Sequence, residues 1–295
     1  MDIRADITNT IIAMLEQGAG NWQRPWETFG AKGLPRNFHS RRPYTGVNVL
    51  LFWHAAKVRG YERNEWLTFN QAKDLGAMVR KGAKGVMGMF YKTVERSSDA
   101  VEGDDDQEAG RRVPMLKPFW VFNVADIDNL PVRDGEAQPA VPVKAFEPVD
   151  IAEQLLSASG AQILLGGDRA CYGVDADTIR LPQPERFATP ADYYATGMHE
   201  LVHWTGHPQR LARTFGKRFG DAAYAFEELV AEMGSAFLCA DIGLHEYTLQ
   251  GHANYLGDWL RVLRADKTAI FTAAKHASAA HALIAGYAAS TRPAQ

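Results

Sequence analysis

Residues 199–203 have the sequence HELVH, which places two histidines four positions apart with a glutamate directly after the first. If this stretch is helical, His199 and His203 project from one face, and both imidazoles can bind the same metal ion. Glu200 would then lie beside that ion, where its carboxylate can accept a proton from an activated water molecule. The spacing predicts metal-assisted peptide hydrolysis, with Zn²⁺ as the expected cofactor and Mn²⁺ as the alternative. Two structural histidines on an amphipathic helix are the other interpretation.

A zinc site of this type needs a third protein ligand. Gln209 stands where a third histidine of the longer HExxHxxGxxH pattern would be, and we interpret His207 as a surface residue or a partner of a ligand. Glu228 and Glu232 lie one helical turn apart, ahead of an apolar run, which a solvated acidic face would not have. We expect Glu228 to bind the metal and Glu232 to accept a hydrogen bond from a ligand imidazole, with the reverse assignment left open.

Hydrolysis also needs a donor for the developing oxyanion. Three residues could supply it, although each could equally be a packing residue: Tyr224, His252 and Tyr255. Upstream, residues 169–182 predict two short strands about a turn at 175–177. We expect the second strand to be a sheet edge beside the metal helix, where an extended peptide substrate could pair by strand addition.

The composition predicts two folded units. The chain has 295 residues, of which 46% are hydrophobic, enough for two modest cores. Cys171 and Cys239 are too few for a disulfide framework. Residues 1–30 have no signal-peptide order, and no run of 18 apolar residues occurs, so we expect a soluble cytoplasmic protein that does not bind a membrane.

Charge is distributed unevenly along the chain. Residues 1–97 contain 15 lysines and arginines against 8 acids, a balance of +7, whereas residues 131–295 contain 14 against 19, a balance of −5. Residues 98–110 contain six acids and no lysine or arginine, which predicts a disordered surface loop over about 98–112.

The basic first part also has aromatic residues between its charges, a mixture that suits single-stranded nucleic acid. Cations can follow the phosphates while rings stack on exposed bases, although core packing and a solvated face are the ordinary uses of these residues. The candidate DNA-contacting residues are Arg36, Arg41, Arg42, Tyr44, Trp66, Arg80, Lys81 and Lys84.

Periodicity and turn residues predict an α+β chain of two domains. Residues 1–130 would form a mixed α/β domain, 131–148 a proline-rich linker, and 149–295 the metal-binding domain. In the first domain we expect helices near 2–17, 46–58 and 70–77, and a hairpin of strands 85–94 and 118–125. In the second we expect helices near 148–158 and 250–264, the helices of the metal site, and a last helix over 268–288.

Seven segments together resemble the plasmid-encoded ArdC antirestriction proteins over essentially the full chain. They are WQRPW at 22–26, YTGVNVLL at 44–51, WLTFNQA at 66–72, VRKGAKG at 79–85, YYATGMHELVHWTGH at 193–207, EELVAE at 227–232 and DKTAIFT at 266–272. The resemblance implies an N-terminal domain that binds single-stranded DNA and a C-terminal zincin-like metallopeptidase domain. It also implies protection of incoming conjugative DNA from host restriction, with metal on His199 and His203 and Glu200 as base.

Two hypotheses follow. In the first, the protein is a DNA-tethered metallopeptidase whose substrate is a protein or peptide, such as a component of the restriction system. In the second, it is a non-catalytic DNA-binding protector with a structural or vestigial metal site. The retained Glu200 favours the first, because a structural site needs no base.

Overall fold

The computed structural model describes residues 2–18, 33–95, 112–131, 148–215, 222–244 and 256–290. Within those ranges, no helix combines the length and apolar character needed to cross a bilayer. The predicted acidic loop, the segment at 22–26 and nearly all of the predicted linker lie outside the described residues. Helices and strands are mixed along the chain, so the α+β class is confirmed.

In the residues that the structure describes, the first part of the chain has three α-helices, six strands and a short 3-10 helix at Val124–Asp126. The helices are α1 (Ile3–Gly18), α2 (Val47–Arg59) and α3 (Phe69–Asp74). The strands are β1 (Arg36–Asn37), β2 (Glu65–Leu67), β3 (Met78–Val79), β4 (Val86–Glu95), β5 (Arg112–Asn123) and β6 (Ile127–Asp128). β4 and β5 pair antiparallel along the full length of β4, which gives the long hairpin that the sequence predicted. The four-stranded sheet has the order β1-β2-β5-β4, and the side chain of Asn48 on α2 bonds to the backbone of Met89 on β4.

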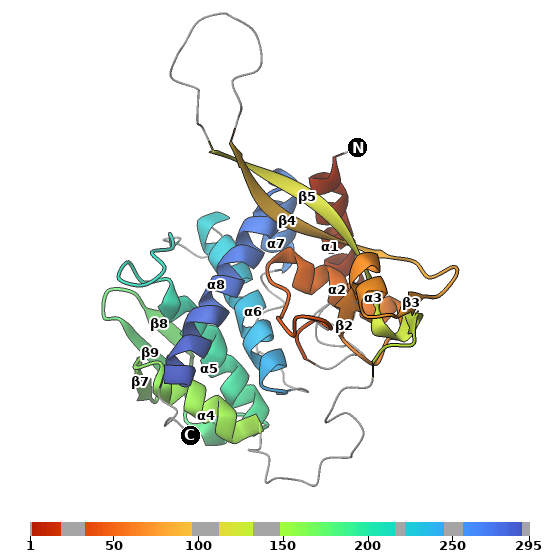
Figure 1. Ribbon diagram of the computed structural model, residues 1–295. Coiled ribbons are helices and arrows are strands. Elements are labelled where there is room, and N and C mark those ends of the chain that lie inside the picture. The colour runs from red at the N-terminus through yellow and green to blue at the C-terminus, as the bar shows by residue number, and fades with distance from the viewer. Residues whose placement is uncertain are drawn as a thin grey trace, which may run out of the picture.

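The second part surrounds the predicted metal helix. Its helices are α4 (Pro148–Ala158), α5 (Pro190–Thr205), α6 (Ala222–Asp241), α7 (Leu256–Ala265) and α8 (Ala269–Ser290). Its strands are β7 (Gln162–Leu165), β8 (Cys171–Gly173) and β9 (Thr178–Leu181). Figure 1 shows α5, α6 and α8 side by side, with the small sheet on the outer side of α5.

The order of that small sheet corrects one prediction. β9 was expected to be an edge strand, but it lies between β7 and β8. The reason is a parallel pairing with β7, a strand that the sequence did not predict, in register from Gln162 opposite Thr178. The described edge beside α5 is therefore β8, which pairs antiparallel with β9.

The apolar core continues across the predicted domain boundary. Ile11 and Leu15 of α1 belong to the same buried cluster as Leu201 of α5 and Trp259 of α7. A hydrogen bond also links the two parts: the hydroxyl of Thr8 on α1 donates to the carbonyl of Lys267 over 2.7 Å. The first helix therefore packs with the helices of the second part.

Candidate metal centre

α5 begins at a capping box. The Thr189 hydroxyl accepts a hydrogen bond from the Asp192 N–H, and the Asp192 carboxylate accepts one from the Thr189 N–H. Pro190 occupies the first helical turn, where its missing N–H costs nothing. The helix then runs through residues 199–203, and His199, Glu200 and His203 are all buried in it.

α6 lies directly against α5. A Cβ added to Gly234 would be 2.8 Å from Cγ2 of Val202, so glycine is what allows the two helices to approach this closely. The Ser235 hydroxyl also donates to the Ala195 carbonyl over 3.1 Å. This packing brings the carboxylates of α6 to the histidines of α5.

His199, His203 and Glu228 form a cluster whose ligand atoms all lie within 4.8 Å of one another. The two histidine Nε2 atoms are 3.1 Å apart. Glu228 places Oε2 at 3.4 Å from Nε2 of His199 and Oε1 at 3.6 Å from Nε2 of His203. Two imidazoles and one carboxylate are a donor set of catalytic zinc sites, and their convergence on one point fits a divalent cation.

Glu232 lies on the other side of the His199 ring. Its Oε2 is 3.7 Å from Nδ1 of His199, whereas Nε2 of that ring faces Glu228. This arrangement favours Glu228 over Glu232 as the third ligand. The separation of 3.7 Å is longer than a hydrogen bond, so a role for Glu232 in orienting His199 stays a prediction.

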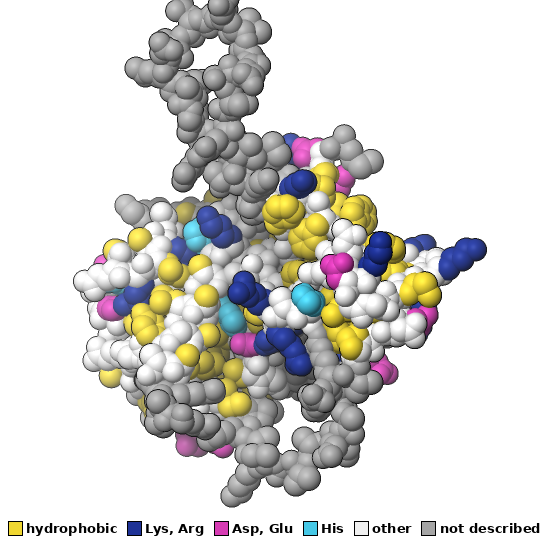
Figure 2. Space-filling model, in the orientation of Figure 1, with side chains coloured by type: hydrophobic (Ala, Val, Ile, Leu, Met, Phe, Trp, Pro, Cys, Tyr) yellow, Lys and Arg dark blue, Asp and Glu magenta, His cyan; other side chains and the backbone are white. Residues whose placement is uncertain are grey.

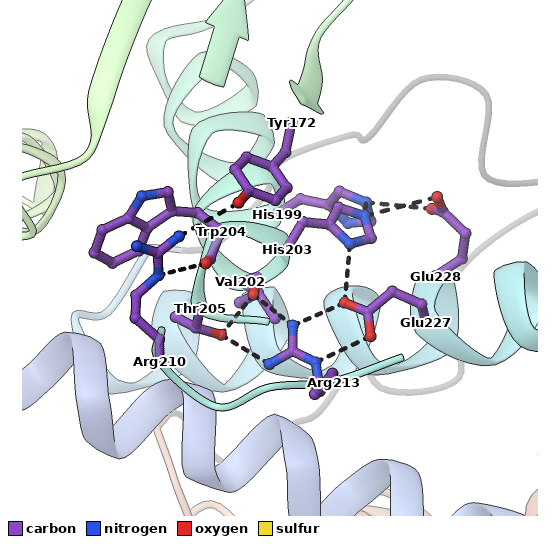
Figure 3. A network of polar contacts seen from close by, with 10 residues as sticks. All are labelled: Tyr172, His199, Val202, His203, Trp204, Thr205, Arg210, Arg213, Glu227 and Glu228. Carbon is purple, nitrogen blue, oxygen red and sulfur yellow. Dashed lines mark hydrogen bonds and ion pairs between the residues drawn. The ribbon is translucent and has the colours of Figure 1, made fainter. Parts of the chain in front are cut away.

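Two residues that the sequence reasoning missed complete the surroundings of His203. Oε1 of Glu227 is 3.1 Å from Nδ1 of His203. Arg213, on the segment after α5, donates to both oxygens of Glu227 over 2.9 and 2.7 Å (Figure 3). The adjacent acid in the sequence EELVAE was the only available signal, because Arg213 lies 14 residues away in the chain.

The buried acids change the protonation of His203. Burial alone would lower its pKa, but the charge of Glu228 and the hydrogen bond to Glu227 outweigh burial and raise the pKa of His203 to about 10. Burial acts to raise the pKa of Glu228, yet the two histidines lower it well below its ordinary value. Without a cation, His203 therefore holds a proton at neutral pH.

A second polar group joins the strands to the end of α5. Arg210 donates to Oδ2 of Asp177 over 3.0 Å and to the Trp204 carbonyl over 2.7 Å, and its guanidinium lies 3.8 Å from the centre of the Trp204 ring. Tyr172 on β8 donates to Asp177 over 2.8 Å. In Figure 3 the Tyr172 ring lies on the same side of α5 as His199. The edge strand is thereby fixed next to the cluster.

The other predicted site residues are not members of the metal cluster or lie outside the described residues. Tyr224 lies in the first turns of α6, one helical turn before Glu228, whereas His252 and Tyr255 are outside the described residues. His207 is half-exposed after the end of α5, where its Nδ1 accepts a hydrogen bond from the Gln209 N–H. His207 is not a member of the metal cluster.

The predicted DNA-contacting residues divide into three groups. Trp66 is a correction: its ring is 0% exposed and its indole N–H donates to Asn64, so the ring belongs to the core. Arg36 and Arg80 are exposed but form ion pairs, Arg36 with Asp241 and Arg80 with Asp128. The remaining candidates are exposed or, for Tyr44, partly exposed: Arg41, Arg42, Tyr44, Lys81 and Lys84.

Exposed aromatic residues on the β4–β5 hairpin were missed. Phe90 is 41% exposed and Trp120 is 57% exposed. Figure 2 shows hydrophobic side chains gathered over this part of the molecule, with lysines and arginines near them. Strand propensity alone could not separate these rings from the buried Trp66.

Comparison with known proteins gives two family matches. Residues 1–122 match the N-terminal domain of anti-restriction factor ArdC, and residues 150–276 match a zincin-like metallopeptidase. Two crystal structures of the antirestriction ArdC protein from the R388 plasmid, one metal-free and one Mn(II)-bound, are each 36% identical. Each comparison covers 99% of this chain and 100% of the other, with TM-scores of 0.78 and 0.77.

Sequence relatives agree with these matches. An uncharacterized protein, y4eC, of Sinorhizobium fredii is 39% identical over 94% of this chain and 89% of its own length. A DNA primase TraC of Escherichia coli is 35% identical over 92% of this chain, but this chain spans only 26% of that protein. The donor cluster lies within the zincin-like match, and one of the two related crystal structures is a Mn(II)-bound form. The chain therefore belongs to the ArdC family of antirestriction proteins, with an ArdC N-terminal domain followed by a zincin-like metallopeptidase domain.

Proposed function

We propose that this protein is a zinc-dependent peptidase that binds single-stranded DNA and protects incoming plasmid DNA from restriction. The observation that carries the proposal is the convergence of His199, His203 and Glu228 beside the buried Glu200. When bound there, a divalent cation would activate water and polarise the scissile carbonyl.

The chain's own residues then perform three tasks. The two imidazoles and the Glu228 carboxylate hold the cation. Glu200 accepts a proton from the attacking water and later delivers it to the leaving amine. The β8 edge, fixed by Tyr172, Asp177 and Arg210, offers backbone groups to an extended peptide.

The surface of the hairpin supports the DNA part of the proposal. Tyr44, Phe119 and Phe90 form an aromatic row, with ring centroids 6.3 Å and 6.0 Å apart along it. Lys117 is exposed and pairs with Phe90 across the strands, so its cation lies on the same face as the row. Bases could stack on the outer rings while Lys117, Arg41 and Arg42 attract phosphates.

The peptidase is tested with Glu200→Gln, which keeps the size of the side chain and removes the base. We expect zinc binding and thermal stability to be retained and cleavage of labelled unfolded casein to fall by about 10²–10⁴-fold. Protection of transferred plasmid DNA is measured in parallel, with His199→Ala as the metal-free comparison. If both variants protect DNA as well as the wild type, strand occupancy rather than proteolysis provides the protection.

The DNA surface is tested with Phe90→Ala in full-length protein and a fluorescent oligothymidylate. Loss of one stacked base is worth about 1–3 kcal/mol, so we expect about 5–150-fold weaker binding. Trp120→Ala is the matched control, because the strand register puts Trp120 on the opposite face of the hairpin from Phe90. Loss of affinity in Trp120→Ala alone would contradict this surface.

A further inference from the structure

The Arg213 guanidinium joins the two helices that carry the metal cluster. Its side chain is 2% exposed, and its Nη1 donates to the Thr205 hydroxyl over 2.8 Å. Its Nη2 donates to the Val202 carbonyl over 2.7 Å, at the end of α5, where a cation is favoured. The same guanidinium binds both oxygens of Glu227 on α6 (Figure 3).

Glu227 connects Arg213 to His203. Its Oε1 is shared between Nη2 of Arg213 at 2.7 Å and Nδ1 of His203 at 3.1 Å. A carboxylate held at two points by a planar guanidinium has a fixed orientation. The ring of His203 is therefore held with Nδ1 toward Glu227 and Nε2 toward His199 and Glu228.

The local sequence leaves room for this contact. A Cβ at position 206 would lie 2.9 Å from Nη2 of Arg213 and 2.6 Å from Cζ of Phe215, so a larger residue there would have to displace one of these side chains. The charge also matters, because Glu227 and Glu228 are adjacent buried acids. A buried carboxylate without a paired cation is strongly unfavourable.

The geometry points to Arg213 as a positioning residue that acts through Glu227 to aim His203 at the metal. This inference rests on the proposed function, since it assumes that the cluster binds a cation. Arg213 itself touches none of the three cluster residues in the hydrogen bonds described above. Its effect should therefore disappear when Glu227 is absent.

The test is a double-mutant cycle in full-length protein with zinc affinity as the readout, measured by competition with a chromophoric chelator. Glu227→Met is expected to weaken zinc binding by about 10–100-fold, the range for partners of metal-bound histidines. Arg213→Met should weaken binding to a similar extent. The double variant should lose no more zinc affinity than either single variant, because both substitutions act through the one hydrogen bond between Glu227 and His203.

The double variant also guards against misfolding, because it removes both buried charges together. The visible spectrum of the Co²⁺ form should change in the double variant and stay unchanged in Arg186→Met. Arg186 is the matched control, because it lies in the same domain and forms an exposed ion pair with Asp168 instead of binding Glu227.

The outcomes separate the two proposals. If wild-type protein binds no zinc, the metal centre itself is wrong. If wild-type protein binds zinc and the double variant has the same affinity and Co²⁺ spectrum, the role of Arg213 is wrong while the metal centre stands. If the losses in the two single variants add in the double variant, Arg213 does not act through Glu227.

Discussion

At the scale of single residues, the pattern HELVH was enough to predict which two imidazoles meet. Their i, i+4 spacing requires only a helix, and α5 supplies it from the capping box at Thr189 onward. Glu228 and Glu232 could be proposed from spacing, and their distances to His199 favour Glu228 as the ligand. Arg213 and Glu227 could not be predicted, because nothing local links two residues 14 positions apart.

The order of the two glutamates gives the first prediction. Glu228→Ala removes a ligand, so zinc binding should be lost at micromolar protein. Glu232→Ala removes only a partner of His199 and should weaken binding by about 10–100-fold. Competition with a chelator measures both, and equal losses, or a larger loss in Glu232→Ala, would reverse the assignment.

The protonation of His203 gives the second prediction. Since its pKa is raised to about 10 in the metal-free site, a cation must displace a proton at neutral pH. Apparent zinc affinity should therefore fall about tenfold for each unit of pH lowered between about 9 and 7. Calorimetry in buffers of different ionisation enthalpy should show release of about one proton. Affinity that does not change over this range would contradict the raised pKa.

The same shift affects the stability of the metal-free protein. A histidine whose pKa is raised on folding stabilises the fold below its ordinary pKa of 6.5, and this contribution is lost as pH rises through about 10. Glu228 has the opposite sign: its lowered pKa stabilises the fold above its ordinary value of 4.5, and the contribution is lost on acidification.

At the scale of elements, α1, α2, α4, α8 and β4 were predicted to within two residues of their bounds, whereas β5 begins at Arg112, six residues before the predicted start at 118. The position of β9 was wrong because its parallel partner β7 is separated from it in sequence and has half-exposed leucines at 164 and 165 in place of a clear alternation. Trp66 was misjudged for a related reason. The ring stacks on Phe52 of α2, with ring centroids 5.2 Å apart, and only the tertiary fold reveals this contact.

The contact between α5 and α6 gives the third prediction. Gly234→Ala would bring a methyl group to 2.8 Å from Val202, so the helices must separate. We expect the free energy of unfolding to fall by about 1–3 kcal/mol, and zinc affinity to fall with it. Denaturant unfolding measures the change. The double variant Gly234→Ala, Val202→Ala should recover part of the zinc affinity, and no recovery would contradict a steric cause.

At the scale of the whole molecule, the two family domains share apolar contacts. α1 packs on α7, and Arg36 of β1 forms an ion pair with Asp241, at the last residue of α6. An isolated fragment of residues 1–130 would expose Ile11 and Leu15, so DNA-binding experiments need the full chain. Sequence alone could not show this contact, because α1 and α7 are separated by most of the chain.

The shared core gives the fourth prediction. A ligand at 100 times its dissociation constant stabilises the native state by about 2.7 kcal/mol. If the chain unfolds cooperatively, zinc should slow amide hydrogen exchange in α1 as much as in α7. Hydrogen exchange with mass spectrometry makes the comparison. Protection of α7 without protection of α1 would show that the N-terminal part opens independently.

The central claim is that one divalent cation is held by His199, His203 and Glu228 with a position left open beside Glu200. Diffraction from zinc-loaded crystals, recorded on both sides of the zinc absorption edge, tests it most directly. The account predicts one strong anomalous peak within about 2.0–2.2 Å of both Nε2 atoms and a Glu228 oxygen. A peak elsewhere, or a fourth protein group that completes the coordination, would contradict it.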